Sequence, residues 1–184
     1  VMRAFEEKRH LIVEAGTGTG KTLAYLVPAV AAALGGNGRV IVSTGTKTLQ
    51  DQLFQRDLPR VRAALQAPVT VALLKGRANY VCRHRLELAA QDGRFGSRDD
   101  VKHLPLIRRF AATHGTGDKG QLSAVPENAP IWSQVTSTRE NCLGSDCPQH
   151  KDCFVMAARR DAQAADLVVV NHHLFFADVM LKDE

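Results

Sequence analysis

The sequence lacks any apolar run long enough to cross a membrane. No stretch approaches the roughly 18 residues that a membrane span needs. The start of the chain, from Val1 to Lys8, also lacks the apolar segment that an export signal requires. Internal repeats and low-complexity segments are missing as well. These absences favour a cytoplasmic globular protein without a membrane partner.

Cysteine is scarce, with 4 residues in a chain of 184, so the protein is not a small scaffold held together by disulfides. Hydrophobic residues make up 45% of the chain, which is enough for a core and for one or two domains. Because no export signal is present, we expect the cysteines to be reduced, and metal or cluster ligation is then a better expectation than disulfides.

Acidic residues are outnumbered, with 19 Asp and Glu against 24 Lys and Arg, a formal net charge of +5. Residues 1–74 carry 9 basic and 5 acidic side chains, residues 75–153 carry 12 and 9, and residues 154–184 carry 3 and 5. The positive charge therefore lies in the first two regions. It permits a polyanionic partner without identifying one.

Apolar runs alternate with helical patterns in the first 74 residues. The runs at 11–14, 39–43 and 69–74 predict strands, and a helical pattern follows each of the first two. After about residue 157 the same alternation returns, with a helix over 157–165, a strand over 167–170 and Asn171 as the N-cap of a helix extending to Leu181. This order predicts an α/β fold, a parallel sheet covered by helices on both faces.

Residues 75–156 interrupt this alternation. Glycines, charged residues, four prolines and all four cysteines fall in this region. We therefore expect residues 1–74 and 157–184 to form one domain and residues 75–156 to form an insertion within it.

The strongest motif is a glycine-rich loop between the first predicted strand and helix. It reads Ala15-Gly16-Thr17-Gly18-Thr19-Gly20-Lys21-Thr22. Glycines let consecutive backbone N–H groups point at phosphate oxygens, Lys21 would reach the β- and γ-phosphates, and the Thr22 hydroxyl would bind Mg²⁺. The spacing predicts an ATP site, although Ala15 stands where the strict pattern has glycine. An ordinary glycine-rich turn is the alternative.

A second polar segment follows the strand at 39–43. It places Thr44, Thr46 and Lys47 at the edge of the sheet where open parallel sheets bind ligands. Short hydroxyl side chains and helix N-terminal amides at this edge can hold a nucleic-acid phosphate. An N-capped helix with no ligand explains the same residues equally well.

The four cysteines have an uneven spacing. Cys82 stands alone, whereas Cys142, Cys147 and Cys153 fall within 12 residues. Four thiolates on turn-rich segments can surround an iron–sulfur cluster or a tetrahedral zinc ion, and one remote with three clustered cysteines favours the iron–sulfur cluster. Zinc and free buried cysteines stay open as alternatives.

Arginines lie near the cysteines in the sequence, next to single aromatic residues. They include Arg77, Arg83, Arg85, Arg108 and Arg109. Such a mixture can bind single-stranded nucleic acid through charge and stacking, and it is equally compatible with a solvated helix face.

These motifs together resemble the DinG/YoaA branch of the XPD-like superfamily 2 DNA helicases. The resemblance rests on the stretch from Glu14 to Pro28, the segment from Ser43 to Leu53, the four-cysteine insertion and the run from Val169 to Leu174. It implies a RecA-like P-loop domain and an ATP-dependent helicase that moves 5′ to 3′ on single-stranded or forked DNA in repair or damage tolerance. It also implies a 4Fe-4S cluster held by Cys82, Cys142, Cys147 and Cys153.

Two further expectations follow from the resemblance. A replicative polymerase accessory subunit is the protein partner that it implies, and the nucleoid is the implied place of action. The Asp-Glu-Ala-His box and the second RecA-like domain of such helicases do not appear in these residues. We therefore expect an N-terminal fragment that binds nucleotide weakly and is inactive alone. A cluster-bearing nucleic-acid-binding or redox-sensing module without motor activity is the competing interpretation.

Overall fold

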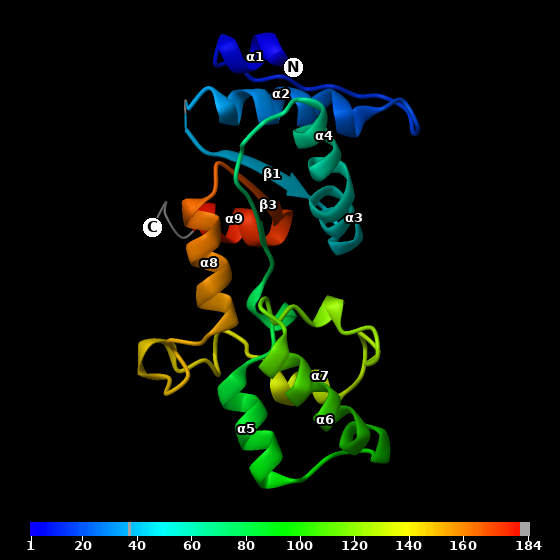
Figure 1. Cartoon of the computed structure of the whole chain (residues 1–184), viewed down its shortest axis with the longest axis vertical. Helices are drawn as coiled ribbons and strands as arrows, with labels where there is room; N and C mark the ends of the chain where they lie inside the picture. Colours follow the sequence, from blue (N-terminus) through cyan, green and yellow to red (C-terminus); the bar gives the residue numbers. More distant parts are fainter. Residues whose placement is uncertain (37, 181–184) are drawn as a thin grey trace. The chain divides into compact units, whose positions relative to one another are not determined.

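The computed structural model describes residues 1–36 and 38–180. The chain forms two compact units, shown in Figure 1. The sheet unit contains Val1–Leu74 and Asp161–Glu184, and the inserted unit contains Lys75–Arg160. Each unit has its own hydrophobic core. No helix in the described part of the chain is long and apolar enough to span a membrane.

The sheet unit is built on three parallel strands. They are β1 (Val40–Thr44), β2 (Val71–Leu74) and β3 (Leu167–Asn171), in the order β1-β3-β2. The central strand β3 is the last of the three in the sequence, and four of its five residues are buried. A run of consecutive apolar residues is typical of a strand covered on both faces. The entire inserted unit lies in the connection from β2 to β3.

Helices cover both faces of this sheet. On one face, α2 (Lys21–Leu34) and α4 (Leu58–Ala64) pack through Leu26, Val30 and Leu58 against Leu167 and Val169. On the other face, the end of α8 (Phe154–Ala164) and α9 (His172–Met180) pack against the alternate β3 side chains, Val168 and Val170. Successive strand residues point to opposite faces, so β3 serves both cores. The predicted α/β fold is confirmed.

Three short helices complete the sheet unit. Helix α1 (Met2–Glu6) lies at the start of the chain, and α3 (Lys47–Gln52) follows β1. A π-helical turn, η1 (Leu53–Asp57), then joins α3 to α4 without a break.

The predicted strands at 39–43, 69–74 and 167–170 correspond to β1, β2 and β3, within two residues at their ends. The expected cap of the last helix is also present, because the backbone N–H of His173 donates to the Asn171 Oδ1 at 2.9 Å. The predicted end of that helix at Leu181 lies outside the described residues.

The predicted strand at residues 11–14 is wrong. These residues adopt no regular structure, and Ile12 is 97% exposed. An apolar run becomes a strand only where neighbouring strands supply hydrogen bonds and other elements cover its faces. In the described part of the chain, the edge of β1 that faces away from β3 pairs with no strand, and the 11–14 run does not join it.

The inserted unit is mainly helical. Its helices are α5 (Arg83–Asp92), α6 (Arg98–Thr113) and α7 (Ile131–Val135), with 3-10 turns η2 (Arg77–Asn79), η3 (Lys119–Gln121) and η4 (Gly144–Asp146). Ser97 begins α6 as its N-cap, accepting a hydrogen bond from the Asp100 backbone N–H at 3.0 Å. Ile107, Ile131 and Val135 form the fully buried centre of the core.

Candidate functional site

The glycine-rich loop leads directly into α2, as the motif requires. Gly20 is the N-cap of α2 with φ 79°, and Gly18 has φ 77°. Residues with side chains rarely adopt this left-handed conformation, so glycine is needed at both positions for the backbone itself. The first turn of α2 leaves backbone N–H groups without intrahelical partners, next to the positive end of the helix dipole. This arrangement suits an anion such as a nucleotide phosphate.

Lys21 and Thr22 occupy the first two positions of α2. The Lys21 Nζ donates to the backbone carbonyl oxygens of Ala15, at 2.7 Å, and of Gly16, so the ammonium group lies against the loop. Thr19 closes the loop with a hydrogen bond from its hydroxyl to the Gly16 carbonyl at 2.8 Å. The structure thus brings the loop backbone, the lysine and the Thr22 hydroxyl together, and their donors fit a phosphate and its Mg²⁺.

Tyr25 lies one turn after Thr22 on α2. Burial raises the pKa of the Tyr25 phenol, whereas its hydrogen bond with the Thr22 side chain acts in the opposite direction. Tyr25 is therefore a neighbour of the Thr22 side chain, which the motif alone does not indicate.

The second predicted site lies at the carboxyl end of β1. The Thr44 hydroxyl donates to the Thr46 carbonyl at 3.2 Å, and the Thr46 Oγ1 accepts from the Leu49 backbone N–H at 3.2 Å. Thr44 is buried, whereas Thr46 and Lys47 are exposed. Thr46 is thus an N-cap of α3, so the helix-capping interpretation accounts for its side chain, while Lys47 lies on the surface beside it.

His172 joins this sheet edge from the neighbouring strand. The Ser43 Oγ and the His172 Nδ1 are 2.6 Å apart, which ties the end of β1 to the start of α9. The ring of His172 also lies beside Gly45, where a Cβ would stand 3.6 Å from its Cδ2. Our sequence analysis missed this residue as a site member. Its position directly after a predicted strand, at the same sheet edge as Thr44, was the signal that could have found it.

The four cysteines belong to the inserted unit, and all are free and partly exposed. Cys82 is the N-cap residue of α5, and Cys153 directly precedes α8. Burial raises the pKa of the Cys82 thiol, and the neighbouring thiols of Cys147 and Cys153 raise it further. Hydrogen bonds from the backbone N–H groups of Arg85 and His84 lower this pKa. Cys82, Cys147 and Cys153 are therefore close enough to interact electrostatically.

Two side-chain contacts tie the cysteine-bearing loop to α5. The Arg83 Nε donates to the Asp152 carbonyl at 3.1 Å, and the Gln149 Nε2 donates to the Glu87 Oε1 at 2.8 Å. Cys142 lies outside these contacts, and its sulfur accepts from the Gly144 N–H at 3.5 Å.

Within residues 1–36 and 38–180, no three His, Cys, Asp or Glu side chains are close enough to hold a metal ion. The donor chemistry of four reduced thiols nevertheless suits a cluster, and three of the four lie in one neighbourhood.

Comparison with known proteins agrees with these features. The DEAD/DEAH box helicase family matches residues 1–88. An ATP-dependent DNA helicase YoaA from Escherichia coli is 51% identical over 183 residues, and one from Haemophilus influenzae is 48% identical over 183 residues. Each alignment covers 100% of this chain and 28% of the relative.

A more distant relative extends the comparison. An ATP-dependent helicase DinG from Mycobacterium tuberculosis is 39% identical over 199 residues, covering 98% of this chain and 30% of that protein. This chain thus spans less than a third of the length of the relatives that it matches. By its sequence and its parallel sheet, the chain is similar over residues 1–88 to the DEAD/DEAH box helicases, and along its length to a segment of the YoaA and DinG helicases.

Proposed function

We propose that this chain supplies the ATP-binding half-site and an iron–sulfur unit to an ATP-dependent DNA helicase. The observation that carries this proposal is the loop from Gly16 to Thr22. Its two left-handed glycines and the lysine at the start of α2 form a phosphate cradle. The relatives named as ATP-dependent DNA helicases match the chain along its entire length, which supports the assignment of ATP and DNA as ligands.

Each residue of the loop has a role in this proposal. Gly16, Thr17, Gly18, Thr19 and Gly20 hold the phosphates through backbone N–H groups, Lys21 neutralises charge on the β- and γ-phosphates, and Thr22 binds Mg²⁺. A Mg²⁺ ion held by the Thr22 hydroxyl would neutralise charge on the phosphate oxygens. The Tyr25 phenol keeps the Thr22 hydroxyl oriented through the contact described above.

The DNA strand is proposed to contact the carboxyl edge of the sheet. Thr44, Thr46 and Lys47 contribute there, with Lys47 as the cation and the first turn of α3 as a source of N–H donors. The complete protein is proposed to move 5′ to 3′ on single-stranded or forked DNA in repair, with a replicative polymerase accessory subunit as its partner. Action on chromosomal DNA would place it at the nucleoid.

Cys82, Cys142, Cys147 and Cys153 are proposed to hold a 4Fe-4S cluster. A cluster bound there would fix the loop from 142 to 153 against α5, because its ligands come from both segments. The proximity of the Cys82, Cys147 and Cys153 thiols supports this ligand set. The Arg83 and Gln149 hydrogen bonds already join the same two segments.

The decisive experiment is ATP hydrolysis by the complete protein, with and without single-stranded DNA. Lys21→Ala is expected to abolish turnover because the phosphate loses its counter-charge, whereas Lys8→Ala, an exposed lysine outside the loop, serves as the control. Hydrolysis retained by the Lys21 variant would contradict the proposal.

A further inference from the structure

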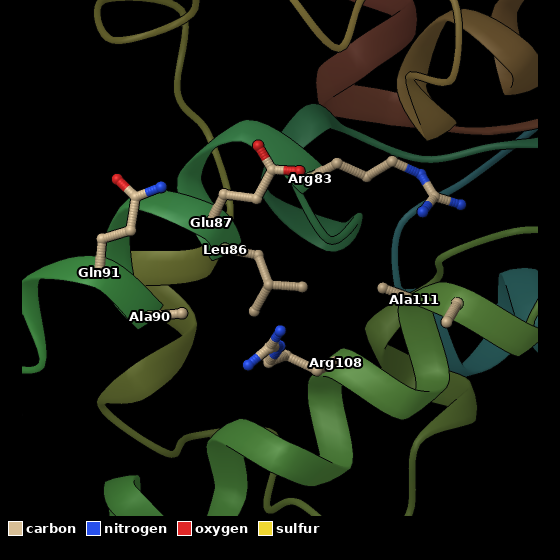
Figure 2. A pocket seen from close by; sticks show the side chains of 8 residues that line it. Arg83, Leu86, Glu87, Ala90, Gln91, Arg108 and Ala111 are labelled. Carbon is tan, nitrogen blue, oxygen red and sulfur yellow. The ribbon is translucent and has the colours of Figure 1, made fainter.

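A cleft of about 380 Å³ lies between α5 and α6 in the inserted unit. Figure 2 shows the side chains of α5 on one side and Arg108 of α6 on the other. The lining residues are Arg83, Leu86, Glu87, Ala90, Gln91, Arg108, Ala111 and Ala112. Its volume falls in the range of small-ligand sites, and no residue of the phosphate loop or of the cysteine set belongs to it.

Apolar side chains lie at the base of the cleft. Leu86 and Ala111 are buried, with 6% and 2% exposure, and Ala90 and Ala112 add only methyl groups. The alanines on both helices leave room between them, and apolar contacts of this kind suit a planar ring.

The two arginines of the cleft differ in the contacts that their guanidinium groups make. Arg83 is fixed, because its guanidinium lies 4.4 Å from the centre of the Phe154 ring and its Nε donates to the Asp152 carbonyl. Arg108 is exposed and makes no hydrogen bond or ion pair within the described residues, and in Figure 2 its side chain points toward Leu86. A guanidinium in this position can bind a phosphate through two hydrogen bonds or stack on a base.

Polar side chains at the rim of the cleft can form hydrogen bonds with the edge of a base. Gln91 offers both a donor and an acceptor, and Glu87, which accepts from Gln149 through its Oε1, has its second oxygen left as an acceptor. A carboxylate at the rim accepts hydrogen bonds from exocyclic amino groups of bases but repels acidic side chains. A base edge can donate to this carboxylate and pair with the Gln91 amide, which an acidic side chain cannot do.

The distribution of charge favours the same ligand. Residues 75–160 carry 14 basic and 9 acidic side chains, which equals the whole net charge of +5, so the rest of the chain is balanced. A phosphate backbone is therefore attracted to the unit that contains the cleft.

We propose that the α5–α6 cleft binds one nucleotide of single-stranded DNA, with its base on the Leu86–Ala111 floor and its phosphate at Arg108. The proposal deepens the proposed function, since it rests on DNA as the ligand and gives the inserted unit its own contact with the strand. The site is separate from Thr44, Thr46 and Lys47, which belong to the sheet unit.

The test measures binding of a fluorescein-labelled 15-nucleotide oligo(dC) to the 184-residue chain by anisotropy, at several salt concentrations. Arg108→Ala is expected to weaken binding about tenfold and to lower the slope of log affinity against log salt by about 0.7, the loss of one phosphate contact. Arg109→Ala is the matched control, because Arg109 is the next residue of α6, is also exposed and does not line the cleft. It is expected to weaken binding less than about twofold.

A second variant fills the cleft without changing charge. Ala112→Leu is expected to weaken binding about fivefold at an unchanged salt slope, since it removes room for the base but leaves Arg108 in place. Thr113→Leu, at the next exposed position outside the cleft, is the control. Circular dichroism of each variant verifies the helical fold.

Three outcomes would overturn the cleft assignment. These are equal losses in the Arg108 and Arg109 variants, unchanged binding by Ala112→Leu, and no binding of the oligonucleotide by the unmodified chain. Displacement of the DNA from Arg108 by a penta-aspartate peptide at equal concentration would assign the cleft to an acidic peptide instead. The Lys21-dependent ATP hydrolysis of the complete protein tests the helicase proposal independently of all four results.

Discussion

The Nζ of Lys75 lies 2.7 Å from the Oδ2 of Asp118, and the two side chains are only 4% and 6% exposed. This buried ion pair joins the first residue of the inserted unit to the loop before η3. Asp118 also accepts from the Gly120 backbone N–H at 3.0 Å through its other oxygen. The carboxylate is thus held through both of its oxygens.

Removing one partner of this pair is predicted to destabilise the inserted unit strongly. Asp118→Ala removes the carboxylate that faces a buried ammonium, at a cost of about 3–5 kcal/mol of unfolding free energy. Urea denaturation followed by circular dichroism measures the loss. Lys102→Met, which breaks the exposed Lys102–Asp99 pair on α6, is the control and should leave the urea midpoint unchanged. Equal effects of the two substitutions would show that burial of the Lys75–Asp118 pair is irrelevant.

Gly117 is predicted to tolerate no side chain. Its φ is +63°, and a Cβ built on it would stand 2.3 Å from the Phe154 ring. Gly117→Ala therefore combines left-handed strain with overpacking, and we expect a loss of about 2–4 kcal/mol. Gly115→Ala is the matched control, since nothing lies within 4 Å of its Cβ position. Thermal melts of the two variants should differ clearly, and equal melting temperatures would contradict the geometry.

Thr46 allows the capping role to be separated from DNA binding. Thr46→Ala removes the acceptor for the Leu49 N–H and is expected to cost about 1 kcal/mol of stability. Thr46→Ser keeps the cap and should restore the stability. If Thr46→Ala leaves oligonucleotide affinity unchanged while Lys47→Ala lowers it, Thr46 only caps α3 and Lys47 makes the phosphate contact.

Asp166 is predicted to make the sheet unit sensitive to acid. Hydrogen bonds from the Thr70 hydroxyl and the Thr70 backbone N–H, at 2.6 and 2.8 Å, lower the pKa of Asp166 below its ordinary value. The ionised carboxylate therefore stabilises the fold at pH values above the unfolded carboxyl range, near 3.9, and this contribution disappears as pH falls through the lowered folded value. Asp166→Asn should have a lower urea midpoint than the unmodified chain at pH 7, and the difference should shrink toward pH 3. A difference that stays constant over this range would exclude the carboxylate as its cause.

The proposed cluster gives a prediction of elemental content. Anaerobically purified protein is expected to hold about four iron and four sulfide ions per chain, with a broad visible absorption band that Cys142→Ser removes. Ser145→Ala, in the same loop, is the control. Zinc in place of iron would refute the cluster and leave the cysteines with a structural role.

Much of the sheet unit could be predicted because its signals are local. The Val40–Thr44 and Leu167–Asn171 strands are short apolar runs bounded by polar residues, and the glycines of the phosphate loop have a fixed spacing. The run at residues 11–14 carries the same local signal, yet whether it pairs depends on a neighbouring strand that its own residues cannot specify.

The inserted unit was less predictable, for physical reasons. Helix α6 contains Pro105, a residue that usually interrupts a helix, within its 16 residues. The α5–α6 cleft depends on the packing of two helices, and its two arginines are 25 positions apart in the sequence. The Ser43–His172 contact likewise joins residues that only the β1–β3 pairing brings together. Such tertiary relationships leave no spacing pattern in the chain.

The position of β3 between β1 and β2 has a consequence for the order of folding. Among the residues that the structure describes, the two outer strands pair only with β3, and 92 residues separate Leu74 from Leu167. During synthesis β1 and β2 therefore cannot form the sheet until β3 has been made, which comes after the whole inserted unit. Early folding of that unit would shorten the loop that β3 must close, and would reduce the entropy lost when the sheet forms. A variant that slows folding of the inserted unit should thus delay formation of the sheet, although the inserted unit contributes no strand to that sheet.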